Sequence, residues 1–147
     1  METLPFEIGE TAHALRKAFT RRAAAFGVTG AQWKVLFKLS LRPELRQSEL
    51  AEILDIEPIT LTRIIDRLEE SGLVERVRDP SDRRAWQLHV TEAAQPLIKK
   101  LRGVAEELFG EAFAGIESQD LEKVRQVLTR IRENVSRSNI ISKAANE

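Results

Sequence analysis

The residues best suited to chemistry in this chain are the threonines and arginines between Arg46 and Thr91. Three of them, Thr60, Thr62 and Arg63, share the N-terminal half of one expected helix with Pro58, and all four residues should face outward. A threonine donates to phosphate or places its methyl group on thymine, and an arginine holds guanine or phosphate. The alternative is a solvated helix face whose charges pair with neighbouring side chains. The turn before this helix and the charged segment after it favour nucleic-acid contact.

A second charged group follows directly, with Arg76, Arg78, Arg83 and Arg84 interspersed with Asp79 and Asp82. Because alternate residues of an extended chain point the same way, we expect Asp82 to orient the guanidinium of Arg84. A narrow minor groove attracts such an arginine without base-specific contacts. Either Arg83 or Arg84 could enter the groove. An ordinary charged turn is the alternative interpretation.

The elements that must position these side chains follow from hydrophobic periodicity. A short amphipathic helix is expected from Gln47 to Leu54, with Leu50, Ile53 and Leu54 inward, and a longer helix from Pro58 to a stop at Gly72. The alternation in 86–90 predicts a strand with Trp86, Leu88 and Val90 on one face. Helix, turn, recognition helix and β-hairpin together predict a winged helix-turn-helix, in a chain that is mainly α with a small β-wing.

This segment resembles the MarR family of bacterial transcription regulators, most closely its SlyA branch. The resemblance is carried by 47–51 (QSELA), 61–69 (LTRIIDRLE), 72–76 (GLVER) and 79–84 (DPSDRR). The family usually has Thr or Ser where this chain has Arg46, so Ser48 is expected to replace part of the helix cap. Motif and resemblance together give these DNA-binding candidates: Ser48, Pro58, Thr60, Thr62, Arg63, Arg67, Arg78, Asp82, Arg83 and Arg84.

Both ends of the chain carry apolar stripes with little of the chain left to cover them. One runs from Ile8 to Ala23 in a helix expected at about 5–25, and another from Leu121 to Val135 in a helix opening at Ser118. Such stripes imply a second subunit, and the resemblance implies a dimer in which the terminal helices interleave. We therefore predict one domain over 1–147. Residues 1–28 and 91–147 would form dimerisation helices, and 29–90 the winged helix-turn-helix lobe.

Capping signals mark two of the remaining helices. Thr29 is expected to cap the second helix, and Thr91 the long helix that follows the hairpin. Pro96 falls about five residues into that long helix, so a bend or a 3₁₀ start is expected there.

Phe19, Trp33 and Phe37 are expected where the first two helices meet, with core packing as the default interpretation. The family resemblance offers another, because many of its members bind small aromatic or phenolic carboxylates between the dimerisation helices and the DNA-binding lobe. In that case His13, Arg16 and Lys17 would supply polar or cationic anchors.

Composition limits the classes of function. Lys+Arg and Asp+Glu number 23 each, so any DNA-binding surface must arise from local arrangement. Absence of cysteine excludes disulfides and thiol sensing. Neither histidine has a partner at catalytic or metal-ligand spacing, and there is no phosphate loop or nucleophile elbow, so no enzyme, cofactor or metal is expected. With no membrane span or signal segment, a cytoplasmic location is expected.

The function predicted from the sequence is a homodimeric, sequence-specific DNA-binding transcription regulator, acting as a repressor relieved by a small aromatic or phenolic ligand. Its partners would be a pseudo-palindromic double-stranded operator and a second copy of the chain. The alternative is a winged-helix protein-interaction module without DNA binding.

Overall fold

The computed structural model describes residues 3–144, with side chains from 3 to 139. The chain forms two compact units, Met1–Phe109 and Gly110–Glu147. Its helices are α1 (Leu4–Ala23), α2 (Gly30–Leu41), α3 (Gln47–Leu54), α4 (Pro58–Glu70), α5 (Gln95–Ala112) and α6 (Ser118–Ala144). Two 3₁₀ turns, Ala24–Phe26 and Glu92–Ala94, and the strands β1 (Val74–Arg78) and β2 (Trp86–Val90) complete the order. The predicted fold class, mainly α with a small wing, is confirmed.

The sequence signals at the start of α2 operate as predicted. The hydroxyl of Thr29 accepts a hydrogen bond from the backbone N–H of Gln32 at 3.2 Å, and the Gln32 side chain accepts one from the Thr29 N–H at 3.0 Å. This reciprocal pair satisfies two N–H groups that an uncapped helix would leave open. Just before it, Gly27 takes φ 76°, a left-handed conformation that ends the 3₁₀ turn after α1.

The start of α3 differs from the prediction. Its cap comes from Glu49, whose carboxylate accepts from the backbone N–H of Arg46 at 3.1 Å, and not from Ser48. The inward position expected for Ile53 is also wrong, because its side chain is exposed. Leu50, Ala51 and Leu54 face the core, and Ile53 lies about 100° around the helix from the middle of that stripe.

The recognition helix α4 is fixed by its buried stripe. Leu61, Ile65 and Leu68 are buried, at the spacing predicted. They join a core of large side chains contributed by α2, α3, β2 and α5: Leu36, Leu39, Leu50, Leu88 and Leu101. This burial leaves the opposite face of α4 free to carry polar side chains.

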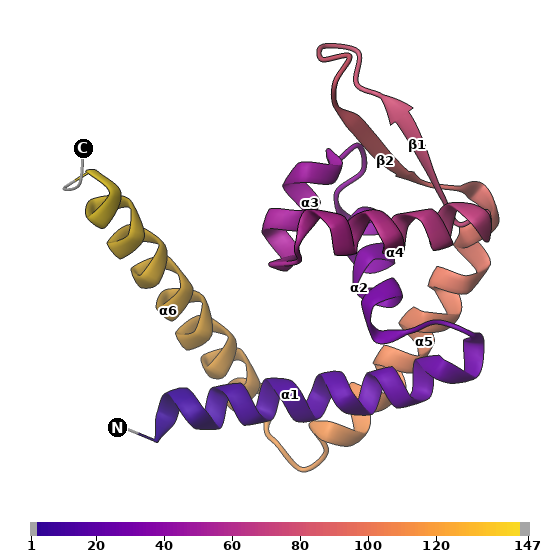
Figure 1. Ribbon diagram of the computed structural model, residues 1–147. Helices are drawn as coiled ribbons and strands as arrows, with labels where there is room; N and C mark the ends of the chain where they lie inside the picture. The colour runs from indigo at the N-terminus through magenta and orange to yellow at the C-terminus, as the bar shows by residue number, and fades with distance from the viewer. Residues whose placement is uncertain (1–2, 145–147) are drawn as a thin grey trace. The chain divides into compact units, whose positions relative to one another are not determined.

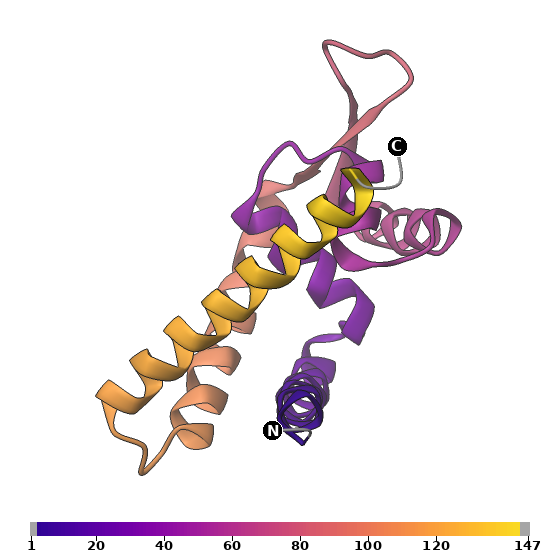
Figure 2. The ribbon, with the colours of Figure 1, turned by 90° about the vertical axis from the view of Figure 1, so that its left-hand side faces the viewer.

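The wing is an antiparallel pair in which Val74 lies opposite Val90 and Arg78 opposite Trp86. A further bridge joins Arg46 to Gln87, and the backbone N–H of Leu88 donates to Leu45 O at 2.9 Å. The chain just before α3 therefore acts as a short third strand that ties the wing to the helix-turn-helix. The loop between β1 and β2 projects beyond α3 and α4 (Figure 1), and the turned view shows the same projection (Figure 2).

The expected 3₁₀ start before Pro96 is confirmed by the turn at Glu92–Ala94. Thr91 precedes that turn, but its side chain does not cap a helix. Its hydroxyl donates to Gly72 O at 2.5 Å, joining the end of β2 to the turn after α4.

In the second unit α6 begins at Ser118 as predicted. None of its side chains from 118 to 139 is buried. Within the described residues, no helix is both long and apolar enough to cross a membrane.

Candidate nucleic-acid interface

The outward face of α4 carries most of the DNA-binding residues predicted for this helix. Pro58, Thr60, Arg63 and Arg67 are exposed. Three of them, Thr60, Arg63 and Arg67, line a shallow hollow of about 200 Å³ together with Thr29 and Gln32 from the start of α2. This places polar and cationic groups of two helices on one surface, next to the N-terminal half of α4.

Thr62 is placed differently. Its hydroxyl donates to Pro58 O at 2.9 Å and accepts from the side-chain amide of Gln47 at 3.0 Å. The half-buried Thr62 therefore connects α3 to α4, and its hydroxyl is occupied within the protein.

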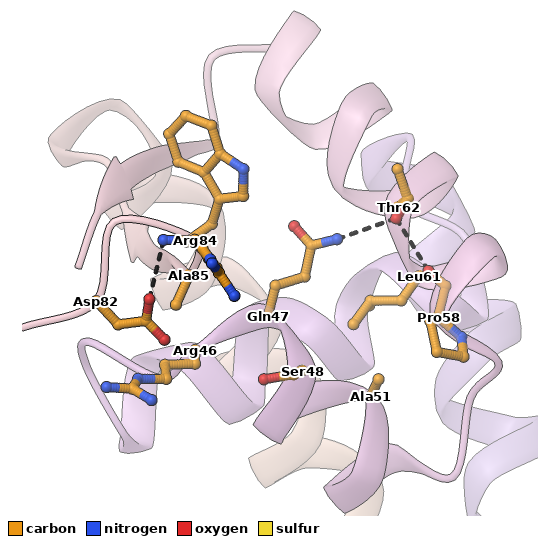
Figure 3. A pocket seen from close by; sticks show the side chains of 11 residues that line it. Arg46, Gln47, Ser48, Ala51, Pro58, Leu61, Thr62, Asp82, Arg84 and Ala85 are labelled. Atoms are coloured by element: carbon orange, nitrogen blue, oxygen red, sulfur yellow. Dashed lines mark hydrogen bonds between the residues drawn. The ribbon is translucent and has the colours of Figure 1, made fainter.

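A groove of about 420 Å³ lies between α3, the first turn of α4 and the wing (Figure 3). Its lining includes five of the predicted DNA-binding residues: Ser48, Pro58, Thr62, Asp82 and Arg84. In Figure 3 Gln47 lies between the wing residues Asp82 and Arg84 on one side and the start of α4 on the other. Sequence reasoning missed Arg46, Gln47 and Trp86 as lining residues. The only signal for Arg46 was an arginine standing where a capping Thr or Ser was expected.

The predicted contact between Asp82 and the Arg84 guanidinium is wrong. The carboxylate of Asp82 instead accepts from the backbone N–H of Arg84 at 3.0 Å, and Ala85 N–H donates to Asp82 O at 3.0 Å. The segment is a tight turn, so the alternation of an extended chain does not apply to it. Asp82 thus holds the backbone at the corner of the loop, where the side chains of both Arg83 and Arg84 are exposed.

Arg78 stiffens the same loop from the other strand. Its guanidinium lies over the Trp86 ring, 3.9 Å from the centroid, and donates to Arg83 O at 2.8 Å. A cation over an aromatic face is attracted by the ring's quadrupole. The two contacts fix the path of the chain that carries Arg83.

An ion pair at the start of the wing loop joins it to the start of α3. Arg46 Nε donates to the buried carboxylate of Asp79 at 2.7 Å, and the Ser81 backbone N–H and hydroxyl donate to that carboxylate at 2.8 and 2.6 Å. The bonds from Ser81, followed by the one from Arg46, hold the pKa of Asp79 well below its usual value. The bond to Asp79 in turn raises the pKa of Arg46. Arg46 therefore stays charged beside the groove.

Arg76, which the sequence groups with the other wing arginines, is a structural residue. Its guanidinium pairs with Asp66 at 2.7 Å and Glu69 at 3.0 Å, both on α4. It also donates to the side-chain oxygen of Gln47 at 3.1 Å and to Thr62 O at 3.3 Å. One arginine on β1 thereby connects α3, α4 and the wing.

A second site lies between α1, α2 and α5. Phe19, Trp33 and Phe37 pack edge to face, with ring centroids 4.6 to 6.0 Å apart, and Trp33 Nε1 donates to Thr20 Oγ1 at 3.1 Å. The three rings line an apolar cavity of about 500 Å³, which Arg16, Lys34 and Lys38 also line. His13 is exposed and is not a lining residue. Among the described residues, no group of three His, Asp or Glu side chains could hold a metal ion.

Comparison with known proteins shows which family has this fold. The model of the MarR family matches residues 28–86, which include α2, α3, α4 and most of the wing. Transcriptional regulator PA3341 is 33% identical, with a TM-score of 0.83 and coverage of 90% of this chain and 98% of that one.

Two further solved structures have the same fold. The transcriptional regulator SlyA is 25% identical, with a TM-score of 0.78 and coverage of 92% and 95%. A MarR family regulator from Listeria monocytogenes, crystallised with 26mer DNA, is 23% identical, with a TM-score of 0.78 and coverage of 88% and 86%. The chain belongs to the MarR family of transcription regulators.

Proposed function

We propose that this protein is a homodimeric regulator that binds a pseudo-palindromic DNA site through α4 and the wing. The observation that carries the proposal is the exposed N-terminal half of α4, with Thr60 and Arg63, beside a groove that ends at Arg84. The Listeria relative crystallised with DNA supports it. A regulator of this kind acts in the compartment that holds the chromosome, which is the cytoplasm of a bacterial cell.

In the proposed complex α4 lies in the major groove, where base edges are distinguishable. Thr60 and Arg63 face the bases, and Arg67 lies one turn further along the helix. The wing then reaches the neighbouring backbone or minor groove with Arg83 or Arg84. The ion pair of Arg46 with Asp79 lies beside the groove and holds the wing loop against the start of α3.

The proposed dimer rests on apolar surface that the chain itself leaves uncovered. Val124, Val127 and Val135 on α6 are each about half exposed, and Leu4 and Phe6 at the start of α1 are exposed as well. We assign residues 1–28 and 91–147 to dimerisation and 29–90 to DNA binding. Deletion of residues 118–147 should give monomer or aggregate by light scattering. A soluble, DNA-binding dimer of the truncated chain would contradict the assignment.

The apolar cavity is proposed to receive a small aromatic carboxylate. Its rings Phe19, Trp33 and Phe37 suit an aromatic body, and the cations Arg16 and Lys34 suit an acid group. A ligand that binds one dimer conformation better than another shifts the population between them, and in this way relieves repression. Titration with salicylate should change Trp fluorescence and weaken DNA binding; no response to aromatic acids at millimolar concentration would remove this part of the proposal.

The second candidate function is a protein-interaction module that has kept the winged helix without DNA binding. Selection from random-sequence duplexes by the full-length protein separates the two. DNA binding predicts enrichment of an inverted repeat whose half-site centres lie about 34–36 Å apart or a multiple of it, as expected for a two-fold dimer. A module without DNA binding would enrich no sequence.

A further inference from the structure

We propose that Ile59 reads a thymine methyl group in each half-site of the operator. This inference rests on the proposed DNA-binding function and names a specificity-determining residue that the sequence reasoning overlooked. Ile59 is the second residue of α4, and 67% of its surface is exposed. The remaining large apolar residues of that helix, Leu61, Ile64, Ile65 and Leu68, are buried or half-buried.

The position of Ile59 on the helix is the first argument. The N-terminal residues of a recognition helix are those that meet base edges. Ile59 stands four residues before the exposed Arg63, so the two share one face and lie one turn apart. The outward face of α4 thus begins with an apolar group and continues with a cationic one.

The chemistry of the position is the second argument. A β-branched residue is a weaker helix former than alanine or the straight-chain residues, and at Ile59 burial does not offset that cost. Acidic side chains stabilise the first turn of a helix, yet the first turn of α4 contains none. Single exposed apolar residues are common on protein surfaces, but this one lies at the leading end of a cationic reading surface. An apolar group there matches the one apolar feature of the major groove, the C5-methyl group of thymine.

The geometry also predicts where that thymine lies. Four residues of α-helix advance about 6 Å along the axis. Base pairs follow one another at about 3.4 Å, so the contacts of Ile59 and Arg63 fall about two base pairs apart. If Arg63 holds a guanine, the thymine read by Ile59 is expected within one to three positions of it.

The surrounding charge favours DNA over a protein as the partner of Ile59. Thr60, Arg63 and Arg67 line the adjoining hollow with neutral Thr29 and Gln32. Arg84 lines the groove that Pro58 also lines, and the carboxylate of Asp82 in that groove is held by the backbone N–H of Arg84. A surface with cations on both sides of an apolar group suits a polyanion that carries methyl groups between its phosphates.

The test uses the full-length protein and the operator enriched from random-sequence duplexes. Each thymine is replaced in turn by deoxyuridine, which removes only the methyl group. The unaltered protein should lose about threefold to tenfold in affinity at one thymine per half-site, the size expected for one lost methyl contact. Ile59→Ala should lose a similar factor on the unmodified operator and become insensitive to deoxyuridine at that thymine alone. Ile59→Val should lie between the two.

The control is Leu41→Ala, measured without any aromatic acid because Leu41 lines the apolar cavity; it removes an equally exposed apolar side chain at the end of α2, away from α4 and the wing. It should leave both affinity and the deoxyuridine pattern unchanged. An Ile59→Ala protein that keeps the full deoxyuridine penalty, or binds as tightly as the unaltered protein, would overturn the inference and leave the proposed function standing. If the selection from random-sequence duplexes enriches no sequence, the proposed function is wrong, and this inference is wrong with it.

Discussion

Replacement of Arg76 should weaken the packing of the wing on the helices, and so lower the stability of the fold, rather than remove a DNA contact. Only 14% of its side chain is exposed, and its guanidinium joins β1 to Asp66, Glu69, Gln47 and Thr62. The two carboxylates are about half exposed, so each ion pair contributes only about 0.5 kcal/mol. The two bonds to neutral oxygens add about 1 kcal/mol each.

Arg76→Met, which keeps much of the aliphatic stem, should therefore lower the free energy of unfolding by about 3 kcal/mol. For a chain of this size that corresponds to a Tm lower by roughly 6–12 °C. Urea and thermal unfolding followed by circular dichroism measure it at fixed protein concentration. Arg83→Ala is the matched control, because its side chain is exposed and its loss should change stability by less than about 0.5 kcal/mol. Equal stability of Arg76→Met and the unaltered protein would refute the assignment.

The remaining predictions concern binding and pH. Arg63→Ala should cost about 1–3 kcal/mol in operator binding and relax base preference if Arg63 holds a guanine, as titrations on base-substituted operators would show. Arg84→Ala should instead weaken binding to many sequences and flatten the salt dependence, measured by titration across salt concentrations. Asp82→Ala should also weaken binding, although it removes a negative charge near DNA, because the backbone N–H of Arg84 loses its acceptor; tighter binding would show that Coulomb repulsion dominates. Because the pKa of Asp79 lies below its ordinary 3.8, its contribution to stability is present above about pH 4 and lost as the pH falls toward the lowered pKa. Asp79→Asn should therefore be less stable than the unaltered protein at pH 7 and lose less stability between pH 4 and 2 by urea unfolding.

The sequence predicted those parts of the fold that depend on local pattern. The stripe Leu61, Ile65 and Leu68 has helical spacing and is buried, and Thr29 carries the local signal of a helix start. Such features depend on residues a few positions apart, and their periodicity is visible in the chain itself.

The wing shows where local pattern fails. Alternation in an extended chain would place Asp82 and Arg84 on one face, but the backbone turns between Asp82 and Ala85. A turn brings a side-chain oxygen onto a nearby backbone N–H, and alternation carries no information about it.

Contacts between residues distant in sequence also cannot be predicted from local sequence patterns. Arg46 and Asp79 lie 33 residues apart, and Arg76 and Gln47 lie 29 apart. Both pairs form only once the segment before α3 pairs with β2 and the wing lies beside the helices. A charged residue in the sequence does not reveal whether its partner will be a protein carboxylate or a DNA phosphate. For that reason the sequence alone does not distinguish Arg76 from the other wing arginines.

Site-directed DNA cleavage gives the most direct test of the central claim, that α4 and the wing contact the operator. The chain contains no cysteine, so a single introduced thiol carries an iron–EDTA cleavage reagent at one known position. Thr60→Cys on α4, Pro80→Cys on the wing loop and Gln126→Cys on α6 would each be labelled, bound to the enriched operator and analysed for strand breaks. We expect cuts inside each half-site from the α4 label, cuts on its flank from the wing label and no operator-specific cuts from the α6 label. Specific cuts from the α6 label alone, or none from α4 and the wing in a complex that still binds, would contradict the account.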